Sequence, residues 1–180
     1  MTTPNRIFLV GPMGAGKTTI GRHLAQSLGM EFRDSDLEIQ RRTGVDIPTI
    51  FEYEGEAGFR ARERQVIEDL TEVDGCVLAT GGGAVMATEN VMRMRSSGKV
   101  VWLQASPAAI RRRMQADAGT AANRPSLTGQ GSLEEIAAVL AEREPLYAGA
   151  AHHLIDTDDL NTDEVVEKIV AIIGSNLTTD

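Results

Sequence analysis

The stretch that decides the fold is RIFLVGPMGAGKT, residues 6–18. Its first five residues form an apolar run typical of a buried strand. The next eight, GPMGAGKT, match G-x-x-x-x-G-K-[ST] at every required position. Residues 16–28 then predict a helix that ends at Gly29. A strand, a glycine-rich turn and a helix in this order indicate a phosphate-binding loop.

The residue types in this loop suit a nucleotide. Glycines allow the backbone to curl so that the N–H groups around Gly14, Ala15 and Gly16 face phosphate oxygens, beside the positive end of the helix. Lys17 adds a full positive charge, and the Thr18 hydroxyl can ligate Mg²⁺. Thr19 follows directly and is expected among the nucleotide-binding residues. The loop therefore predicts binding of ATP with Mg²⁺, but it leaves the acceptor of the phosphoryl group open.

The rest of the chain alternates between strand-like and helix-like segments. Further strands are predicted at residues 31–34, 76–80, 99–104 and 152–157. One helix is predicted over residues 47–73, with interruptions near Gly55 and Gly58. Three more are predicted to begin with a capping box, formed by Ser35 with Glu38, Ser132 with Glu135, and Asn161 with Glu164. A further helix is predicted to begin at Ser106-Pro107. Apolar strands alternating with helices predict an α/β fold: one domain over residues 1–180, with a parallel sheet covered by helices on both faces. Ligands of such sheets bind at the carboxyl ends of the strands.

Composition narrows the class of protein. The chain has 180 residues, of which 42% are hydrophobic and 24% charged, as expected for one globular domain. A net charge of −8 argues against a protein that coats nucleic acid, and no apolar run approaches the ~20 residues that span a bilayer. The single cysteine, Cys76, excludes an internal disulfide framework. We expect a cytoplasmic monomer with small-molecule partners and with no nucleic-acid or membrane partner.

Two carboxylates follow the second predicted strand, in Asp34-Ser35-Asp36. Acids are common in a first helical turn because they stabilise the helix dipole. However, Asp34 also lies at a strand's carboxyl end, where Mg²⁺ requires a nearby carboxylate. Asp36 is placed to accept a proton or hydrogen bond from an attacking hydroxyl. We favour these functional interpretations of both residues.

Other candidate residues suggest an anionic acceptor. Arg60 and Glu63 share a helix face, a spacing that is most often a solvated salt bridge, but an anion would need such a guanidinium. The run 81–83 is three glycines, which indicates that a ligand approaches bare backbone. Arg124 lies in a stretch without periodicity, residues 115–131, which we interpret as a lid, and Arg143 lies further along. An arginine on a closing loop can stabilise charge on a transferring phosphoryl group.

These residues together resemble the shikimate kinase family across nearly the whole chain. The resemblance is carried by the phosphate loop 11–18, Asp34-x-Asp36, Phe59-Arg60-x-x-Glu63, Gly81-Gly82-Gly83, Arg124-Pro125 and Arg143-x-Pro145-Leu146-Tyr147. Only the first of these motifs is widespread among P-loop proteins. The resemblance implies a three-layer P-loop NTPase fold like that of nucleoside monophosphate kinases. Such a fold has a five-stranded parallel sheet, a substrate-binding helical region at about 34–64 and a lid at about 115–131. It further implies transfer of the ATP γ-phosphoryl to the 3-hydroxyl of shikimate, with Mg²⁺.

The resemblance also implies a role for each matched residue. Lys17 would bind phosphate and Thr18 would ligate the metal, with Asp34 contributing to the coordination shell of Mg²⁺. Asp36 would bind the shikimate hydroxyls and act as the base, and residues 81–83 would present backbone to the ring hydroxyls. The remaining implied roles fall on arginines: Arg60 and Arg143 for the shikimate carboxylate, Arg124 as the catalytic lid arginine beside ATP, and Arg113 near the adenine.

The chain departs from the family pattern in its lid. The family motif Arg-Pro-Leu-Leu is replaced by Arg124-Pro125-Ser126-Leu127, which predicts looser packing of the closed lid. Extra residues between Arg113 and Arg124 also weaken the match of Arg113.

Two alternatives follow from the phosphate loop alone. One is a related kinase that acts on gluconate or a nucleoside monophosphate. The glycines at 81–83 and the pair Phe59-Arg60 argue against this alternative. The other is a nucleotide-dependent switch. A GTPase switch would carry an Asn-Lys-x-Asp motif, and the sequence has none.

Overall fold

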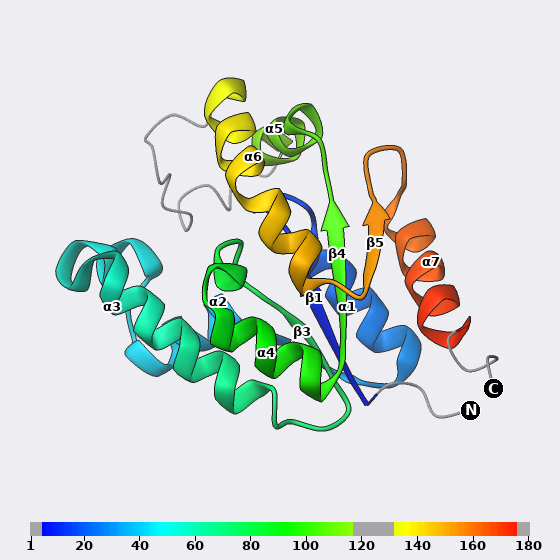
Figure 1. Cartoon of the computed structure of the whole chain (residues 1–180), viewed down its shortest axis with the longest axis horizontal. Helices are drawn as coiled ribbons and strands as arrows, with labels where there is room; N and C mark the ends of the chain where they lie inside the picture. The colour runs from blue at the N-terminus through cyan, green and yellow to red at the C-terminus, as the bar shows by residue number, and fades with distance from the viewer. Residues whose placement is uncertain (1–4, 117–131, 176–180) are drawn as a thin grey trace.

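The fold is a five-stranded parallel sheet with helices on both faces (Figure 1). The computed structural model describes residues 5–116 and 132–175. The strands are β1 (Arg6–Val10), β2 (Glu31–Asp34), β3 (Cys76–Ala79), β4 (Lys99–Gln104) and β5 (His153–Asp156), in the order β2-β3-β1-β4-β5. Every neighbouring pair is parallel. The predicted fold class is therefore confirmed, and β1 lies at the centre of the sheet.

The helices form the two outer layers. They are α1 (Lys17–Leu28), α2 (Ser35–Thr43), α3 (Ile47–Leu70), α4 (Thr88–Ser97), α5 (Pro107–Ala116), α6 (Leu133–Ala150) and α7 (Thr162–Ser175), with a short 3₁₀ turn η1 (Ala84–Met86). None of the helices within residues 5–116 and 132–175 combines the length and the apolar character that crossing a membrane requires.

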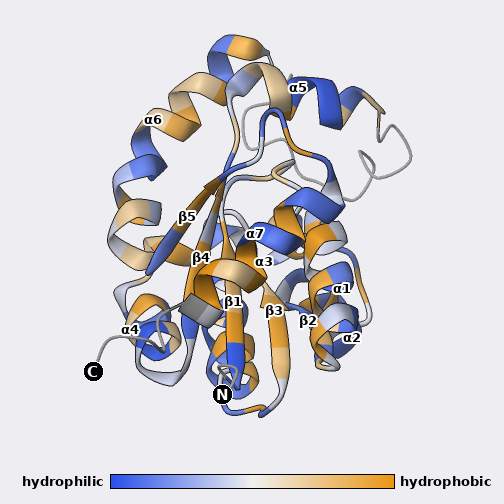
Figure 2. Cartoon of the chain, turned by 90° about the vertical axis from the view of Figure 1, so that its right-hand side faces the viewer, coloured by the Kyte–Doolittle hydropathy of each residue, from blue (hydrophilic) through white to orange (hydrophobic). Residues whose placement is uncertain are grey.

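The core consists of two apolar clusters, one on each face of the sheet. Successive side chains of a strand point to opposite faces, and β1 shows this directly. Ile7 and Leu9 pack with residues of α1 and α7, whereas Phe8 and Val10 pack with residues of α3 and α4. Figure 2 shows the hydrophobic colouring concentrated on the central strands. Burial on both faces explains why the three inner strands β1, β3 and β4 are mainly apolar, whereas the edge strands β2 and β5 carry charged residues. It also fixes the position of the loop that follows β1.

The sequence did not predict helix α4, which links β3 to β4. Parallel strands need a crossover connection of about a dozen residues, so a helix in this place is expected from topology. Its apolar pattern is weak, because one of its two fully buried side chains, Asn90, is polar and donates to the Ala84 carbonyl at 2.9 Å. The other is Met94.

The capping predictions were right except at α2. Ser132 with Glu135 caps α6, and Asn161 exchanges the same pair of bonds with Glu164 at α7. At α2, however, the N-cap is Asp34, and Ser35 is the first helical residue. The predicted capping box of Ser35 with Glu38 was therefore wrong. The Ser35 hydroxyl is already used, since it accepts from the Gly81 N–H at 3.0 Å.

Helix α3 is kinked as predicted at Gly55, whose φ of 70° and ψ of −177° are not helical. A residue without a Cβ adopts this backbone conformation at little cost. Gly58 remains helical, so the second predicted interruption was wrong. The segment beyond the kink carries Arg60 and Glu63.

Candidate active site

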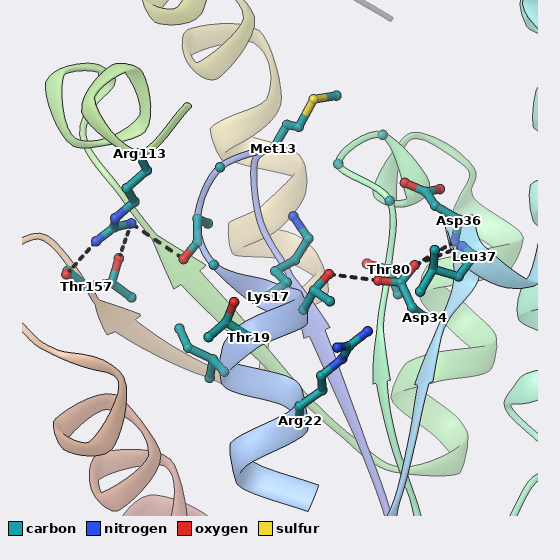
Figure 3. A pocket seen from close by; sticks show the side chains of 18 of the residues that line it. Met13, Lys17, Thr19, Arg22, Asp34, Asp36, Leu37, Thr80, Arg113 and Thr157 are labelled. Atoms are coloured by element: carbon teal, nitrogen blue, oxygen red, sulfur yellow. Dashed lines mark hydrogen bonds between the residues drawn. The ribbon is translucent and has the colours of Figure 1, made fainter. Parts of the chain in front are cut away.

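A cavity of about 740 Å³ lies where the phosphate loop, α2, α3, α5 and α6 meet, and Figure 3 shows part of its lining. It is lined by every predicted site residue that the structure describes: Gly14, Ala15, Gly16, Lys17, Thr18, Thr19, Asp34, Asp36, Arg60, Gly81, Gly82, Gly83, Arg113 and Arg143. The other predicted residue, Arg124, lies outside the described residues. So does the predicted lid except for Gln115 and Ala116, which end α5.

The phosphate loop leaves the N-terminus of α1 available to an anion. Gly14 and Gly16 have φ of 84° and 90°, a conformation that favours glycine. Gly16 is the N-cap of α1 and makes no side-chain cap, and the first turn of the helix has no acidic residue. The Lys17 ammonium donates to the carbonyls of Gly11 and Pro12, both at 2.7 Å. The loop thus keeps its lysine and a positive helix end at the base of the cavity.

Asp34 connects the phosphate loop to helix α2. One carboxylate oxygen accepts from the Thr18 hydroxyl at 2.8 Å, and the other accepts from the backbone N–H groups of Asp36 and Leu37 at 2.9 and 3.1 Å (Figure 3). Within the described residues, no group of three or more His, Cys, Asp or Glu side chains could hold a metal by itself. A hydroxyl beside one carboxylate suits Mg²⁺, which takes most of its remaining ligands from phosphates and water.

Asp36 follows in the first turn of α2 and has an unsatisfied carboxylate oxygen. Its Oδ1 is shielded from solvent and accepts no hydrogen bond within the described part of the chain. Burial raises the pKa of Asp36 to about 7, with a further contribution from the charges of Asp34 and Glu63, against the opposing effect of Lys17 and Arg60. A carboxyl group that lines the cavity and has a pKa near neutral pH is suited to accept a proton.

Arg60 and Glu63 form a buried ion pair on α3. Arg60 Nη1 lies 2.7 Å from Glu63 Oε1, and their side chains are only 15% and 1% exposed. The alternative of a solvated surface pair was therefore wrong. Burial raises the pKa of Glu63, and the Arg60 charge opposes this shift. The Oε2 of Glu63 has no hydrogen-bond partner in residues 5–116 and 132–175.

The glycines at 81–83 make room for the protein's own charged side chains. None of the three has a positive φ, so backbone freedom does not require glycine there. A Cβ on Gly83 would overlap the Arg60 guanidinium, and one on Gly82 would lie 3.6 Å from Arg143 Nη1. A Cβ on Gly81 would lie 2.8 Å from both Asp36 Oδ1 and Glu63 Oε2. The turn thus has space for the Arg60 guanidinium only because Gly83 has no side chain, and the Arg143 guanidinium lies beside the neighbouring Gly82.

Of the three consecutive arginines on α5, only Arg113 lies at the cavity. It donates to the Thr157 hydroxyl at 3.1 Å and to the Thr157 carbonyl at 2.9 Å, and it reaches the Ala15 carbonyl of the phosphate loop at 3.5 Å (Figure 3). Burial lowers its pKa. Arg111 and Arg112 are exposed. The structure thus places Arg113 beside the phosphate loop.

Sequence reasoning missed the cavity residues that follow β5. Thr157, Leu160 and Asn161 line the same cavity as the phosphate loop. The rule that ligands bind at the carboxyl ends of parallel strands applies to β5 as well, so it could have indicated this segment.

Fold and site together define a P-loop phosphotransferase. The shikimate kinase family model matches residues 13–174. The chain is 48% identical over 170 residues to the shikimate kinase of Methylococcus capsulatus, covering 94% of this chain and 93% of that protein. The chain belongs to the shikimate kinase family: it is an enzyme that uses ATP to phosphorylate shikimate.

Solved structures agree with this assignment. The shikimate kinase of Acinetobacter baumannii in complex with shikimate is 45% identical, with a TM-score of 0.91 over 98% of this chain and 97% of that one. The shikimate kinase of Aquifex aeolicus is 35% identical, with a TM-score of 0.81 over 96% and 98% of the two chains. Gluconate and nucleoside monophosphates are not favoured as acceptors by these comparisons.

Proposed function

We propose that this enzyme transfers the γ-phosphoryl group of Mg-ATP to the 3-hydroxyl of shikimate, and that Arg60 and Arg143 bind the shikimate carboxylate. The observation that carries this proposal is the convergence of two guanidinium groups from separate helices on one glycine turn, in the cavity that also contains Lys17. Planar guanidinium groups match a carboxylate through paired hydrogen bonds.

The nucleotide would occupy the other side of the cavity. The backbone N–H groups of residues 14–16, the Lys17 ammonium and the Thr19 side chain would contact its phosphates, and Arg113 would lie near its base. Thr18 and Asp34 would hold Mg²⁺, which would neutralise charge on the phosphates. Arg124, in the predicted lid, would stabilise the same negative charge, a role that rests on the sequence alone.

On the acceptor side, Asp36 would orient the 3-hydroxyl and take its proton as the hydroxyl oxygen attacks the γ-phosphorus. The N–H of Gly81 is already bound to Ser35, whereas those of Gly82 and Gly83 have no acceptor in the described residues. These two groups would therefore be the donors to the acceptor. Positioning and stabilisation of charge would supply most of the rate enhancement. We further propose that the enzyme works as a cytoplasmic monomer.

Purified protein with Mg-ATP should release ADP rapidly with shikimate, and only slowly with gluconate, with AMP or without acceptor. The neutral amide of shikimate should be a much poorer substrate, because it lacks the charge that Arg60 and Arg143 are proposed to bind. A coupled assay of ADP release measures the rate with each of these acceptors. Equal rates for shikimate and its amide would contradict the role given to the two arginines.

Gly83→Ala should weaken acceptor binding without affecting the nucleotide. The new Cβ would overlap the Arg60 guanidinium, which is tied to Glu63 and cannot move away without breaking that ion pair. We expect the KM for shikimate to rise about tenfold or more, in line with the cost of ~1–3 kcal/mol for overpacking. The KM for ATP should stay within about twofold. Gly149→Ala is the matched control, because a Cβ there meets no atom within 4 Å.

A further inference from the structure

Two buried hydroxyl groups hold the glycine turn 81–83 from opposite sides. The Gly81 N–H donates to the Ser35 hydroxyl at 3.0 Å, and the Tyr147 hydroxyl donates to the Gly82 carbonyl at 2.6 Å. Ser35 and Tyr147 are 0% and 1% exposed. Ser35 comes from α2 and Tyr147 from α6, so the turn is tied to two helices that are far apart in the sequence.

Neither hydroxyl residue lines the cavity, although each belongs to a motif whose other members do. Ser35 lies between Asp34 and Asp36, and Tyr147 lies one helical turn after Arg143. A role in binding the acceptor directly is therefore excluded for both side chains by their position. Any effect of Ser35 on the reaction must pass through the backbone of the turn or through α2, whereas Tyr147 can also act through the side chain of Arg143.

The turn needs such contacts because it has no side chains of its own to pack. A glycine segment loses more conformational entropy on ordering than any other, so external hydrogen bonds are required to fix it. Two further bonds are local: Ala84 N donates to the Gly81 carbonyl at 3.1 Å, and Met86 N to the Gly83 carbonyl at 3.0 Å. With these groups engaged, the N–H groups of Gly82 and Gly83 are the donors left over in the described part of the chain.

The tyrosine is well suited to a fixed contact. Its ring packs against Trp102, with centroids 5.7 Å apart, so the hydroxyl has little freedom to move. Burial raises the pKa of Tyr147 to about 12, which keeps the hydroxyl protonated, and therefore a donor, throughout the neutral range.

We propose that Ser35 and Tyr147 are positioning residues, which aim the free N–H groups of Gly82 and Gly83 at the acceptor. Ser35 fixes the Gly81 N–H that precedes them, and Tyr147 fixes the Gly82 carbonyl, which belongs to the same peptide unit as the Gly83 N–H. This inference rests on the proposed function of the same site. It assigns acceptor affinity to two residues that never touch the acceptor.

Ser35→Ala removes one hydroxyl and little else, whereas Tyr147→Phe also removes a contact with the Arg143 side chain, so Ser35→Ala is the decisive variant. Each variant should raise the KM for shikimate about 3- to 10-fold, as expected for one neutral hydrogen bond, with kcat and the KM for ATP within about twofold of wild type. Thr71→Val is the control, because it removes a buried hydroxyl that donates to the Glu68 carbonyl at the end of α3 and does not line the cavity. It should leave the KM for shikimate unchanged.

Several outcomes would overturn the inference. An unchanged KM for shikimate in Ser35→Ala would do so, as would an equal rise in the KM for ATP or an equal rise in Thr71→Val. Calorimetric binding of ADP to each variant establishes that it is folded. If the wild-type enzyme does not phosphorylate shikimate, the proposed function is overturned, and this inference with it.

Discussion

Asp36→Asn should abolish most turnover while the affinity for ATP changes little. A general base contributes about 10²- to 10⁴-fold to the rate, and asparagine keeps the size of the side chain without its basicity. The measurement is kcat with saturating Mg-ATP and shikimate, together with the dissociation constant of ADP. Asp163→Asn, at a side chain that is 86% exposed, is the matched control. Unimpaired turnover in Asp36→Asn would remove Asp36 from the mechanism.

The pH dependence of the wild type gives an independent check on Asp36. The pKa of Asp36 is about 7, and only the ionised carboxylate can accept a proton. The value of kcat/KM for shikimate should therefore fall about tenfold per pH unit below pH ~7. The residual activity of Asp36→Asn should lack this decline.

The same substitution should stabilise the free enzyme at high pH. The folded-state pKa of about 7 lies above the ordinary value of 3.8, so Asp36 contributes most stability at low pH, and this contribution is lost as pH rises through 7. Ionised Asp36 thus costs at most ~4 kcal/mol at pH 8. Asn removes that cost. A Tm that rises at pH 8, with a smaller rise at pH 5, would show that lost turnover does not reflect unfolding.

Arg60→Met should reduce both stability and acceptor binding. Met fills similar space without charge, but it leaves the Glu63 carboxylate, which is 1% exposed, without its partner. Removing one member of a buried ion pair costs about 3–5 kcal/mol. Loss of a guanidinium from the acceptor subsite should also lower kcat/KM for shikimate about 100-fold or more. Urea unfolding and steady-state kinetics measure the two effects separately.

Adding Glu63→Gln separates these effects. The double variant should regain most of the stability lost in Arg60→Met, because no buried charge is left unpaired, yet it should remain impaired toward shikimate. The penalty in the single variant should also decrease as the pH falls, because burial raises the pKa of Glu63 and protonation of its carboxylate removes the unpaired charge. Arg111→Met, at an exposed arginine on α5, is the neutral control. Recovery of shikimate binding in the double variant would contradict the role of Arg60.

The parts of the fold that could be predicted are those with strong local signals. Strand β1 and the loop after it are specified by an apolar run and by a motif in which each residue type has a steric or electrostatic reason. Helix α4 could not be predicted in this way, because one of its two buried side chains is polar. Its presence follows instead from the parallel pairing of the sheet, which is a property of the whole chain.

The site was predictable in its residues but not in its contacts. Asp36 and Arg60 were identified from type and position, yet their burial depends on segments that are distant in the sequence. The competition between Asp34 and Ser35 for the cap of α2 illustrates the same limit. Both residue types cap helices well. The choice is made by Gly81, 46 residues away, which uses the Ser35 hydroxyl.

The bare turn at residues 81–83 has a consequence for engineering the acceptor range of this enzyme. The space that side chains at Gly81 and Gly83 would have filled is occupied by Arg60, Asp36 and Glu63. Bulk added to the turn would therefore displace the enzyme's own charged groups before it excluded any competing molecule. Apolar wall positions such as Ile47 and Phe51 are the better starting points for libraries that aim at larger or smaller hydroxy acids.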